Sequence, residues 1–260
     1  MNYVKSCLII TMLLGIGYSQ CDANGDGDLN ILDIIEEVNC ILTNCWEGEL
    51  ICDIDGICYE TIRIGAQLWM AENLKVTHYN NGDEIPTGYS DEDWFELETG
   101  AYAVYPTDND ETSQSTCGDD CADIYGNLYN WYVVDDDRGL CMEGWHVPSF
   151  PEVQDLLTYL GGQTAGAGGK MKSTGTIEDG DGLWYAPNEG ATNESGFTAL
   201  PGGHRRYSYN NSYYGNMGNG AIFWTSPDMW NYSLSYSSST NYYSPAIYER
   251  DGFSIRCLED

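Results

Sequence analysis

Basic residues are scarce in this chain of 260 residues, which has 10 Lys and Arg against 41 Asp and Glu and a formal net charge of -31. Such a charge repels the phosphates of nucleic acids and the headgroups of anionic lipids, so neither is expected as a partner. Histidine is also rare, and His78, His146 and His204 stand far apart in the sequence. Each histidine is therefore predicted to be structural rather than a metal ligand.

Long apolar runs are missing after residue 20, so the mature chain is not expected to span a membrane. The first twenty residues combine Lys5, an apolar run over 7–14 and small residues before position 20, which is the pattern of a secretory signal peptide. We expect cleavage after Ser19 or Gln20, and a secreted or extracellular protein. A lipid anchor on Cys21 is the alternative, and it would keep the protein at the cell surface.

Known catalytic motifs are also missing. The chain has no Gly-x-Ser-x-Gly elbow, no phosphate-binding loop and no His-Glu-x-x-His helix. No two carboxylates are singled out as a pair for glycoside hydrolysis. The sequence therefore predicts a protein that is not an enzyme; a deep cleft with convergent, perturbed carboxylates would favour the opposite.

Cysteine is plentiful by contrast, with nine of the ten cysteines following the predicted signal peptide. In an exported chain they indicate disulfides, and zinc is disfavoured because no pair of Cys-x-x-Cys units is present. Cys117 and Cys121 are expected to close part of an acidic loop over 106–123. The odd count leaves one cysteine unpaired or joined to another chain.

A calcium loop is predicted directly after the signal peptide. Oxygen side chains occupy positions 1, 3, 5, 9 and 12 of a twelve-residue loop, glycine occupies position 6, and position 7 supplies a backbone carbonyl. The predicted calcium ligands are Asp22, Asn24, Asp26, Asp28 (through its carbonyl), Asn30 and Asp33. An acidic turn without metal is the alternative. Apolar residues at helical spacing over 31–42 predict a helix after the loop.

The loop resembles that of dockerins, because Asp33 stands where an EF-hand has glutamate. Dockerins carry two such repeats and bind a cohesin. Here Asp53 and Asp55 begin a second acidic turn that never completes the twelve positions, so cohesin docking is not expected. Calcium is the predicted cofactor of a small loop-helix module over 21–50.

After residue 50 the sequence consists of short runs in which apolar and polar residues alternate, with many glycine and aromatic residues. Strands are predicted over Tyr59–Ile64, Ala221–Thr225 and Phe253–Cys257. One helix is predicted from a capping box at Ser149 and Glu152, followed by an apolar stripe and two glycines at 161–162. The result is an α+β domain with more loop than average.

Six ordered blocks in this region resemble the Fibrobacter succinogenes major paralogous domain. They are Ile64–Leu74, Tyr125–Trp131, Cys141–Ser149, Thr192–Arg205, Phe223–Ser226 and Gly252–Cys257. The departures are Met142, where that family usually has proline, and Val153, which replaces a tryptophan. The order of parts more distantly resembles the C-type lectin-like fold and its formylglycine-generating enzyme branch.

This resemblance implies a C-type lectin-like domain with irregular loops and few helices over 51–260, preceded by the signal peptide over 1–20 and the calcium module over 21–50. It also implies a disulfide between Cys141 and Cys257, because lectin-like folds often tie the first helix to the last strand. The enzyme branch would need a reactive cysteine pair, and a structural bridge is the simpler role for Cys257.

A ligand surface is predicted in the stretch 207–248, which is crowded with Tyr, Trp and Asn and has no basic residue. Aromatic faces stack on sugar rings while amides bond hydroxyl groups. The predicted ligand-binding residues are Tyr213, Tyr214, Trp230 and Tyr232. Packing in a β-rich core is the alternative, and it is favoured for Trp224. Acidic and amide residues over 179–194 are expected to shape turns, with a second calcium site as the alternative.

The expected function is therefore a secreted, non-catalytic binding or adhesion protein that recognises extracellular polysaccharide or glycan. Two alternatives stay open: a structural subunit of a surface layer or extracellular fibre, and a scaffold-docked component of a polysaccharide-degrading assembly. The expected partners are a glycan and, in the alternatives, a second copy of the chain or a cell-surface scaffold.

Overall fold

The computed structural model describes residues 8–11, 17–20, 50–106, 117, 121–162, 165–208, 211–246 and 248–260. The chain divides into two compact units, Met1–Gly48 and Glu49–Asp260. In the first unit, β1 (Leu8–Thr11) pairs with β2 (Gly17–Gln20) in an antiparallel ladder. The six predicted calcium ligands and the helix predicted after them lie outside the described residues. No helix in the described ranges is long and apolar enough to cross a membrane.

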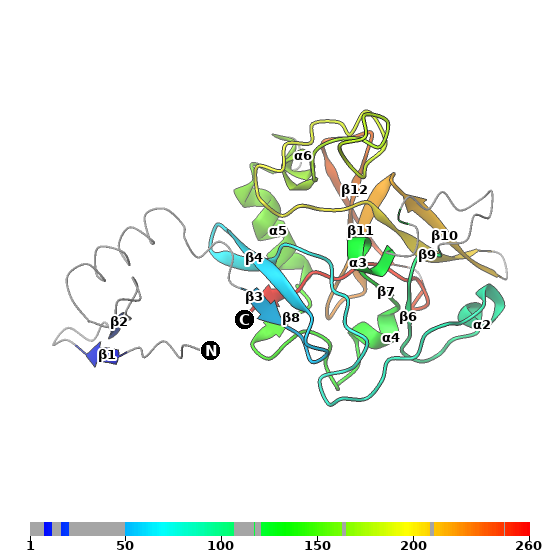
Figure 1. The fold of residues 1–260 in the computed structure, drawn as a ribbon, viewed down its shortest axis with the longest axis horizontal. Helices are drawn as coiled ribbons and strands as arrows, with labels where there is room; N and C mark the ends of the chain where they lie inside the picture. Colours follow the sequence, from blue (N-terminus) through cyan, green and yellow to red (C-terminus); the bar gives the residue numbers. More distant parts are fainter. Residues whose placement is uncertain are drawn as a thin grey trace. The chain divides into compact units, whose positions relative to one another are not determined.

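Two five-stranded sheets form the framework of the second unit (Figure 1). The first has the order β3-β4-β5-β14-β8, with antiparallel neighbours. Its strands are β3 (Leu50–Cys52), β4 (Cys58–Ile64), β5 (Gln67–Met70), β8 (Trp145–His146) and β14 (Leu258–Glu259). The second has the order β10-β9-β11-β12-β13, in which only β9 and β11 run parallel. Its strands are β9 (Gly202–Ser208), β10 (Asn211–Met217), β11 (Gly220–Thr225), β12 (Trp230–Ser235) and β13 (Asn241–Pro245).

The helices are short, and a further two-stranded ladder joins β6 (Tyr102–Ala103) to β7 (Leu128–Tyr129). The described helices are α2 (Asp91–Phe95), α3 (Cys121–Tyr125), α4 (Trp131–Val134), α5 (Phe150–Tyr159) and α6 (Ala167–Met171). The described residues are thus mostly β with few helices, which agrees with the α+β prediction at this coarse level.

Helix α5 confirms the predicted capping box. The Glu152 carboxylate accepts hydrogen bonds from the Ser149 backbone N–H and hydroxyl, both at 2.7 Å, while the Ser149 oxygen caps the Glu152 N–H. These bonds satisfy N–H groups that the first turn of a helix leaves without partners. Gly161 and Gly162 follow with φ of 101° and 81°, a backbone region that favours glycine and lets the chain leave the helix axis.

The apolar face of α5 is buried against residues of both sheets. Val153 and Leu156 are fully buried and pack in one cluster with Trp69 of β5 and Phe223 of β11. Each such side chain contributes about 1.5 to 3 kcal/mol when fully buried. Because one helix covers residues from both sheets, α5 joins the two sheets into one core.

The last predicted strand differs from the structure. Phe253 pairs with Tyr129 and Ser254 with Phe223 only as isolated bridges, and the regular strand β14 begins after Cys257. The prediction of a strand over Phe253–Cys257 is therefore wrong. Consecutive residues of this segment bond to different parts of the chain, so no single neighbour supports a continuous ladder.

Three disulfides lie in the described residues, none of whose cysteines is free. Cys141 pairs with Cys257 across 116 residues, which is the pairing that the family resemblance implies. Cys117 pairs with Cys121, and Cys52 with Cys58 across the β3–β4 hairpin. The interpretation of the cysteines as disulfides is confirmed for these six; Cys21, Cys40 and Cys45 lie outside the described residues.

Candidate functional site

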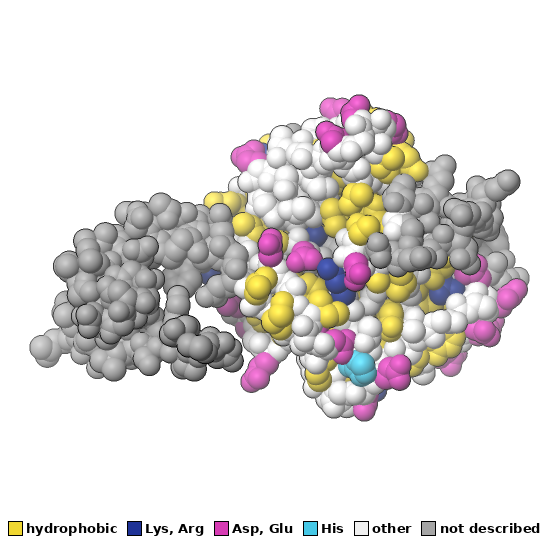
Figure 2. All heavy atoms as spheres, in the orientation of Figure 1, with side chains coloured by type: hydrophobic (Ala, Val, Ile, Leu, Met, Phe, Trp, Pro, Cys, Tyr) yellow, Lys and Arg dark blue, Asp and Glu magenta, His cyan; other side chains and the backbone are white. Residues whose placement is uncertain are grey.

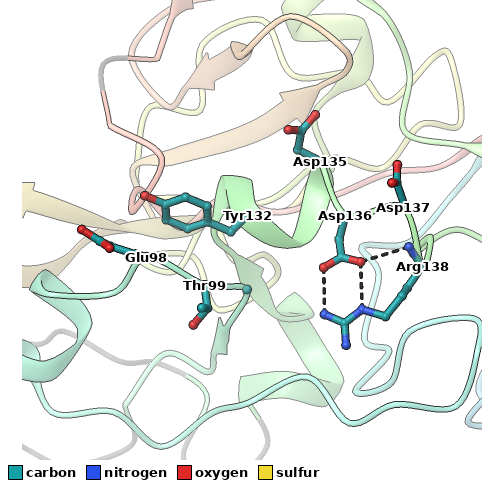
Figure 3. Close-up of a pocket in the computed structure, with 8 residues that line it drawn as sticks. Glu98, Thr99, Tyr132, Asp135, Asp136, Asp137 and Arg138 are labelled. Carbon is teal, nitrogen blue, oxygen red and sulfur yellow. Dashed lines mark hydrogen bonds and ion pairs between the residues drawn. The ribbon is translucent and has the colours of Figure 1, made fainter.

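An open hollow of about 680 Å³ lies between the segment that follows α2 and the turn that follows α4. Figure 3 shows Glu98 and Thr99 on one side, the Asp135–Arg138 turn on the other and Tyr132 between them. Figure 2 shows acidic side chains scattered over the drawn face of the second unit, with fewer basic ones. The lining of the hollow contains four acidic residues, Glu98 and Asp135–Asp137, and the basic residue Arg138.

Asn130 holds the two walls of the hollow together. Its side-chain oxygen accepts from the Ala101 N–H at 3.0 Å and from the Val133 N–H at 3.3 Å, which caps α4. Its amide donates to the Thr99 carbonyl at 2.9 Å. Asn130 is fully buried, so these bonds form away from water and position both walls.

The positive charge in the lining of the hollow, on Arg138, is paired with carboxylates. Arg138 donates Nε and Nη2 to Asp136 at 2.8 and 2.7 Å, donates Nη1 to Asp83 at 3.0 Å, and stacks 3.7 Å above the ring centre of Tyr79. Its hydrogen bonds lower the pKa of Asp136. The remaining carboxylates, on Glu98, Asp135 and Asp137, form no ion pair within the described residues.

This charge balance decides what the hollow can attract. It favours cations and neutral hydroxyl-rich groups and repels anions. Across the described residues, however, no group of three or more His, Cys, Asp or Glu side chains is arranged to hold a metal ion. Sequence reasoning did not single out this hollow, although the charged run 135–138 directly after an apolar segment was a usable signal.

The four predicted ligand-binding residues do not form one surface. Tyr213 and Tyr214 lie on β10 and Trp230 and Tyr232 on β12, with β9 and β11 between them. Tyr213 is 44% exposed, whereas Tyr214 is half-buried and packs against Tyr105 with ring centres 5.2 Å apart. The predicted stretch is therefore divided over two places in the second sheet.

Tyr232 corrects the prediction most clearly. It is fully buried and stacks on Phe223 with ring centres 4.9 Å apart. Burial raises its pKa above the ordinary value. The expectation that Tyr232 lies on an exposed ligand face is wrong, because its face of β12 is covered by the core around α5. Trp224 is fully buried, as predicted.

Trp230 belongs to a partly exposed group that we call the aromatic cluster, formed by Phe150, Trp230 and Tyr243. Trp230 stacks on Phe150 with ring centres 4.8 Å apart, and Phe150 contacts Tyr243 edge-on with ring centres 5.0 Å apart. Tyr243 is 42% exposed, and Phe150 and Trp230 are half-buried. Tyr243 lies directly opposite Tyr232 in the ladder, so the cluster continues the buried face outward to the edge strand β13.

The second acidic turn serves the protein's own backbone. Asp53 accepts from the Ile57 N–H at 2.9 Å and from the Tyr59 hydroxyl at 2.5 Å. Asp55 accepts from the Thr77 hydroxyl at 2.8 Å and bonds to His78 at 2.6 Å. The carboxylates thus anchor the Cys52–Cys58 hairpin instead of lining a metal loop.

The residues over 179–194 likewise shape turns, as expected. Asp181 accepts from the Thr176 N–H at 2.9 Å, and Asn193 from the Thr198 N–H at 2.9 Å. Asn188 and Asn193 have positive φ, a conformation that Asn tolerates better than most residues. Glu194 is 3.5 Å from the Lys170 ammonium.

The three histidines occupy separate places. His146 bonds to Asp260 at 2.7 Å and to Glu152 at 3.1 Å. Partial burial opposes its charge, but these bonds outweigh burial and raise its pKa. His204 is 3% exposed, and neither ring nitrogen has a hydrogen-bond partner among the described residues. Burial, with the nearby Arg206, lowers its pKa to about 3, so His204 is neutral near pH 7.

The fold and these sites define a mostly β, disulfide-bonded domain with partly exposed aromatic side chains and an acidic hollow. A family model described as the Fibrobacter succinogenes major domain matches residues 62–259, and the chain belongs to this family. A comparison with curated proteins finds no significant match, and a comparison with solved structures finds none either.

Proposed function

We propose that this chain is a secreted, non-catalytic binding or adhesion protein that recognises extracellular polysaccharide. The observation that carries the proposal is the aromatic cluster of Phe150, Trp230 and Tyr243, which leaves aromatic surface exposed at a sheet edge. Sugar rings present apolar C–H faces that pack on such rings while their hydroxyl groups stay in water. Tyrosine and tryptophan provide this contact at a low cost in side-chain entropy.

Adjacent tyrosines on β13 offer a matched test. Tyr243→Ala is expected to weaken binding to insoluble neutral polysaccharide about fivefold, on the order of 1 kcal/mol for one lost stacking contact. Tyr242→Ala is the control, because Tyr242 is 52% exposed and successive side chains of a strand point to opposite faces. Depletion isotherms on cellulose and on polysaccharides chosen from a glycan array provide the measurement.

Both tyrosines are partly exposed, so the melting temperature of either variant should stay close to that of the parent. Equal losses for the two variants would show that the cluster has no special role. Failure of the parent to bind any polysaccharide on the array would reject the proposed function.

Calcium completes the proposal through the loop over 22–33, for which the support is the ligand spacing in the sequence. Asp26→Ala is expected to abolish the calorimetric calcium signal, because it removes a side-chain ligand. Asp28→Ala is the matched control, since Asp28 contributes its backbone carbonyl and that group survives the substitution. An unchanged titration for Asp26→Ala would contradict the calcium assignment.

We also propose that the second unit has a C-type lectin-like fold. Two features support this: helix α5 follows the segment Gly144–Pro148, and the long Cys141–Cys257 bridge ties the region before that helix to the closing segment. The fold by itself assigns no ligand, so the glycan proposal depends on the aromatic cluster.

A further inference from the structure

The β9–β10 hairpin carries two neighbouring arginines, of which Arg205 forms an ion pair and the Arg206 guanidinium, among the described residues, interacts only with the Phe253 ring. Arg205 lies between the rings of Trp94 and Tyr214, at 4.3 and 4.8 Å, and its Nη2 is 2.9 Å from the Asp91 carboxylate. Arg206 follows it in the strand and therefore points to the other face of the hairpin. In a chain with 41 acidic residues, Arg206 forms no ion pair within the described residues, and its buried Nε has no hydrogen-bond partner.

Register places three side chains together on the Arg206 face. Tyr213 lies directly opposite Arg206 in the ladder, and His204 is two residues before Arg206 on the same strand. Residues with this spacing share one face of a sheet. The Tyr213 ring stands edge-on to His204, with centroids 5.7 Å apart. Arg206 is half-buried and Tyr213 is 44% exposed, so this face reaches solvent.

His204 supplies an independent observation. Its side chain is almost fully buried, and in the ranges that the structure describes neither ring nitrogen has a hydrogen-bond partner. A buried polar atom without a partner costs about 1 to 3 kcal/mol, and native proteins keep few such atoms. Gly215 lies opposite His204 in the ladder, and without a side chain there it leaves room for the imidazole. An imidazole, a guanidinium and a tyrosine ring thus lie on one face. Within the part of the chain that the structure describes, the His204 nitrogens and the Arg206 Nε have no hydrogen-bond partner, and the Arg206 guanidinium lies 5.2 Å from the ring centre of Phe253.

We propose that the His204–Arg206–Tyr213 face is a subsite for an anionic saccharide. The Arg206 guanidinium takes the carboxylate or sulfate group in a paired, charge-assisted hydrogen bond. The exposed Tyr213 ring packs on the apolar face of the sugar. When the Tyr213 ring turns onto the sugar, the nitrogens of neutral His204 become accessible and can donate to and accept from sugar hydroxyl groups.

The proposal deepens the proposed function by naming a class of saccharide, and it uses different residues from the aromatic cluster. Acidic residues more than about 8 Å from the subsite are largely screened at physiological ionic strength. A short anionic saccharide therefore meets mainly the Arg206 guanidinium, whereas nucleic acid or an anionic membrane would meet the whole acidic surface.

The test uses the full chain and calorimetric titration with tetragalacturonate, its methyl ester and a sulfated gluco-oligosaccharide. We expect binding of an anionic probe, about tenfold weaker binding for Arg206→Met, and a smaller loss for Arg206→Lys, which keeps the charge without the paired geometry. Tyr213→Ala should weaken binding about fivefold, while Tyr213→Phe should not. Arg63→Met is the matched control, because Arg63 lies on β4 and, among the described residues, donates only to the Ala66 carbonyl.

Dependence on Arg206 for the carboxylated or the sulfated probe supports the subsite and identifies the preferred anion. Three results would overturn it: equal effects of Arg206→Met and Arg63→Met, no binding of either anionic probe, or binding of the methyl ester as tight as that of the acid with no dependence on Arg206 for the sulfated probe. Binding of neutral polysaccharide through Tyr243 is measured separately, so failure of the subsite and failure of the proposed function give different results. Arg206→Lys keeps the test valid if Arg206→Met does not fold.

Discussion

Arg256→Lys is expected to lower the free energy of unfolding by about 3 to 5 kcal/mol, although it keeps the positive charge. Arg256 is 1% exposed and donates Nε to the Asn73 side chain at 2.7 Å and Nη2 to the Thr198 carbonyl at 3.0 Å. Its Nη1 donates to the Met70 carbonyl at 3.2 Å and also bonds to the Phe197 carbonyl. One planar group thus links two segments of the core that are distant in sequence, Met70–Asn73 and Phe197–Thr198.

Lysine cannot replace this arrangement. Its single ammonium sits on a flexible stem and cannot reach acceptors spread around a plane, so buried carbonyls lose their donors. The guanidinium also lies 4.6 Å from the ring centre of Phe197, a contact that the planar group makes best. Burial lowers the pKa of Arg256 to about 10, which leaves it charged at pH 7.

Urea unfolding at pH 7 measures this effect, with Arg63→Lys as the control. Within the described part of the chain Arg63 donates only to the Ala66 carbonyl, at 3.5 Å, so its replacement should change the free energy of unfolding by less than about 0.5 kcal/mol. Equal stability of the two variants would show that the hydrogen bonds of Arg256 contribute little beyond its charge.

Loss of the Cys141–Cys257 bridge is the second large effect. Replacing both cysteines by serine is expected to cost about 5 kcal/mol, because a cross-link across 116 residues removes much of the entropy of the unfolded chain. Both cysteines are buried in the core that contains Trp224 and Phe253. In the chain-entropy model, the bridge stabilises the protein mainly by lowering the entropy of the unfolded state.

The Cys52–Cys58 bridge provides a matched comparison, because its separation is only 6 residues. The same chain-entropy argument gives about 2 kcal/mol for the corresponding double serine variant. Chemical denaturation of both variants and the parent under non-reducing conditions measures the difference. A smaller loss at Cys141–Cys257 than at Cys52–Cys58 would contradict the entropic explanation.

Family motifs and local signals predicted much of the framework. The blocks from Ile64 to Cys257 indicated the family that the family model matches over 62–259. The strand at Tyr59–Ile64 and the capping box at Ser149 depend on residues within one element, and both are present. The prediction of a strand over Phe253–Cys257 failed because the hydrogen-bond partners of this segment are distant in sequence, and no pattern of neighbouring residues indicates them.

The candidate sites depended more on the tertiary structure. The hollow forms because Asn130 bonds the Thr99–Ala101 segment to the start of α4, and these two walls are about thirty residues apart in the sequence. Charge composition could indicate an acidic surface, but it could not indicate that Arg138 is already paired with Asp83 and Asp136. Only the folded chain brings those three charges together.

The sequence by itself determined the charge, the cysteine chemistry, the best helix and the family, since each depends on composition or on residues close along the chain. The tertiary structure alone decided which tyrosines are exposed. Tyr232 and Tyr243 are paired across the same ladder, yet one is fully buried and the other is 42% exposed. The physical reason is that burial depends on what covers a strand, and the core around α5 covers the middle of this face but not its edge.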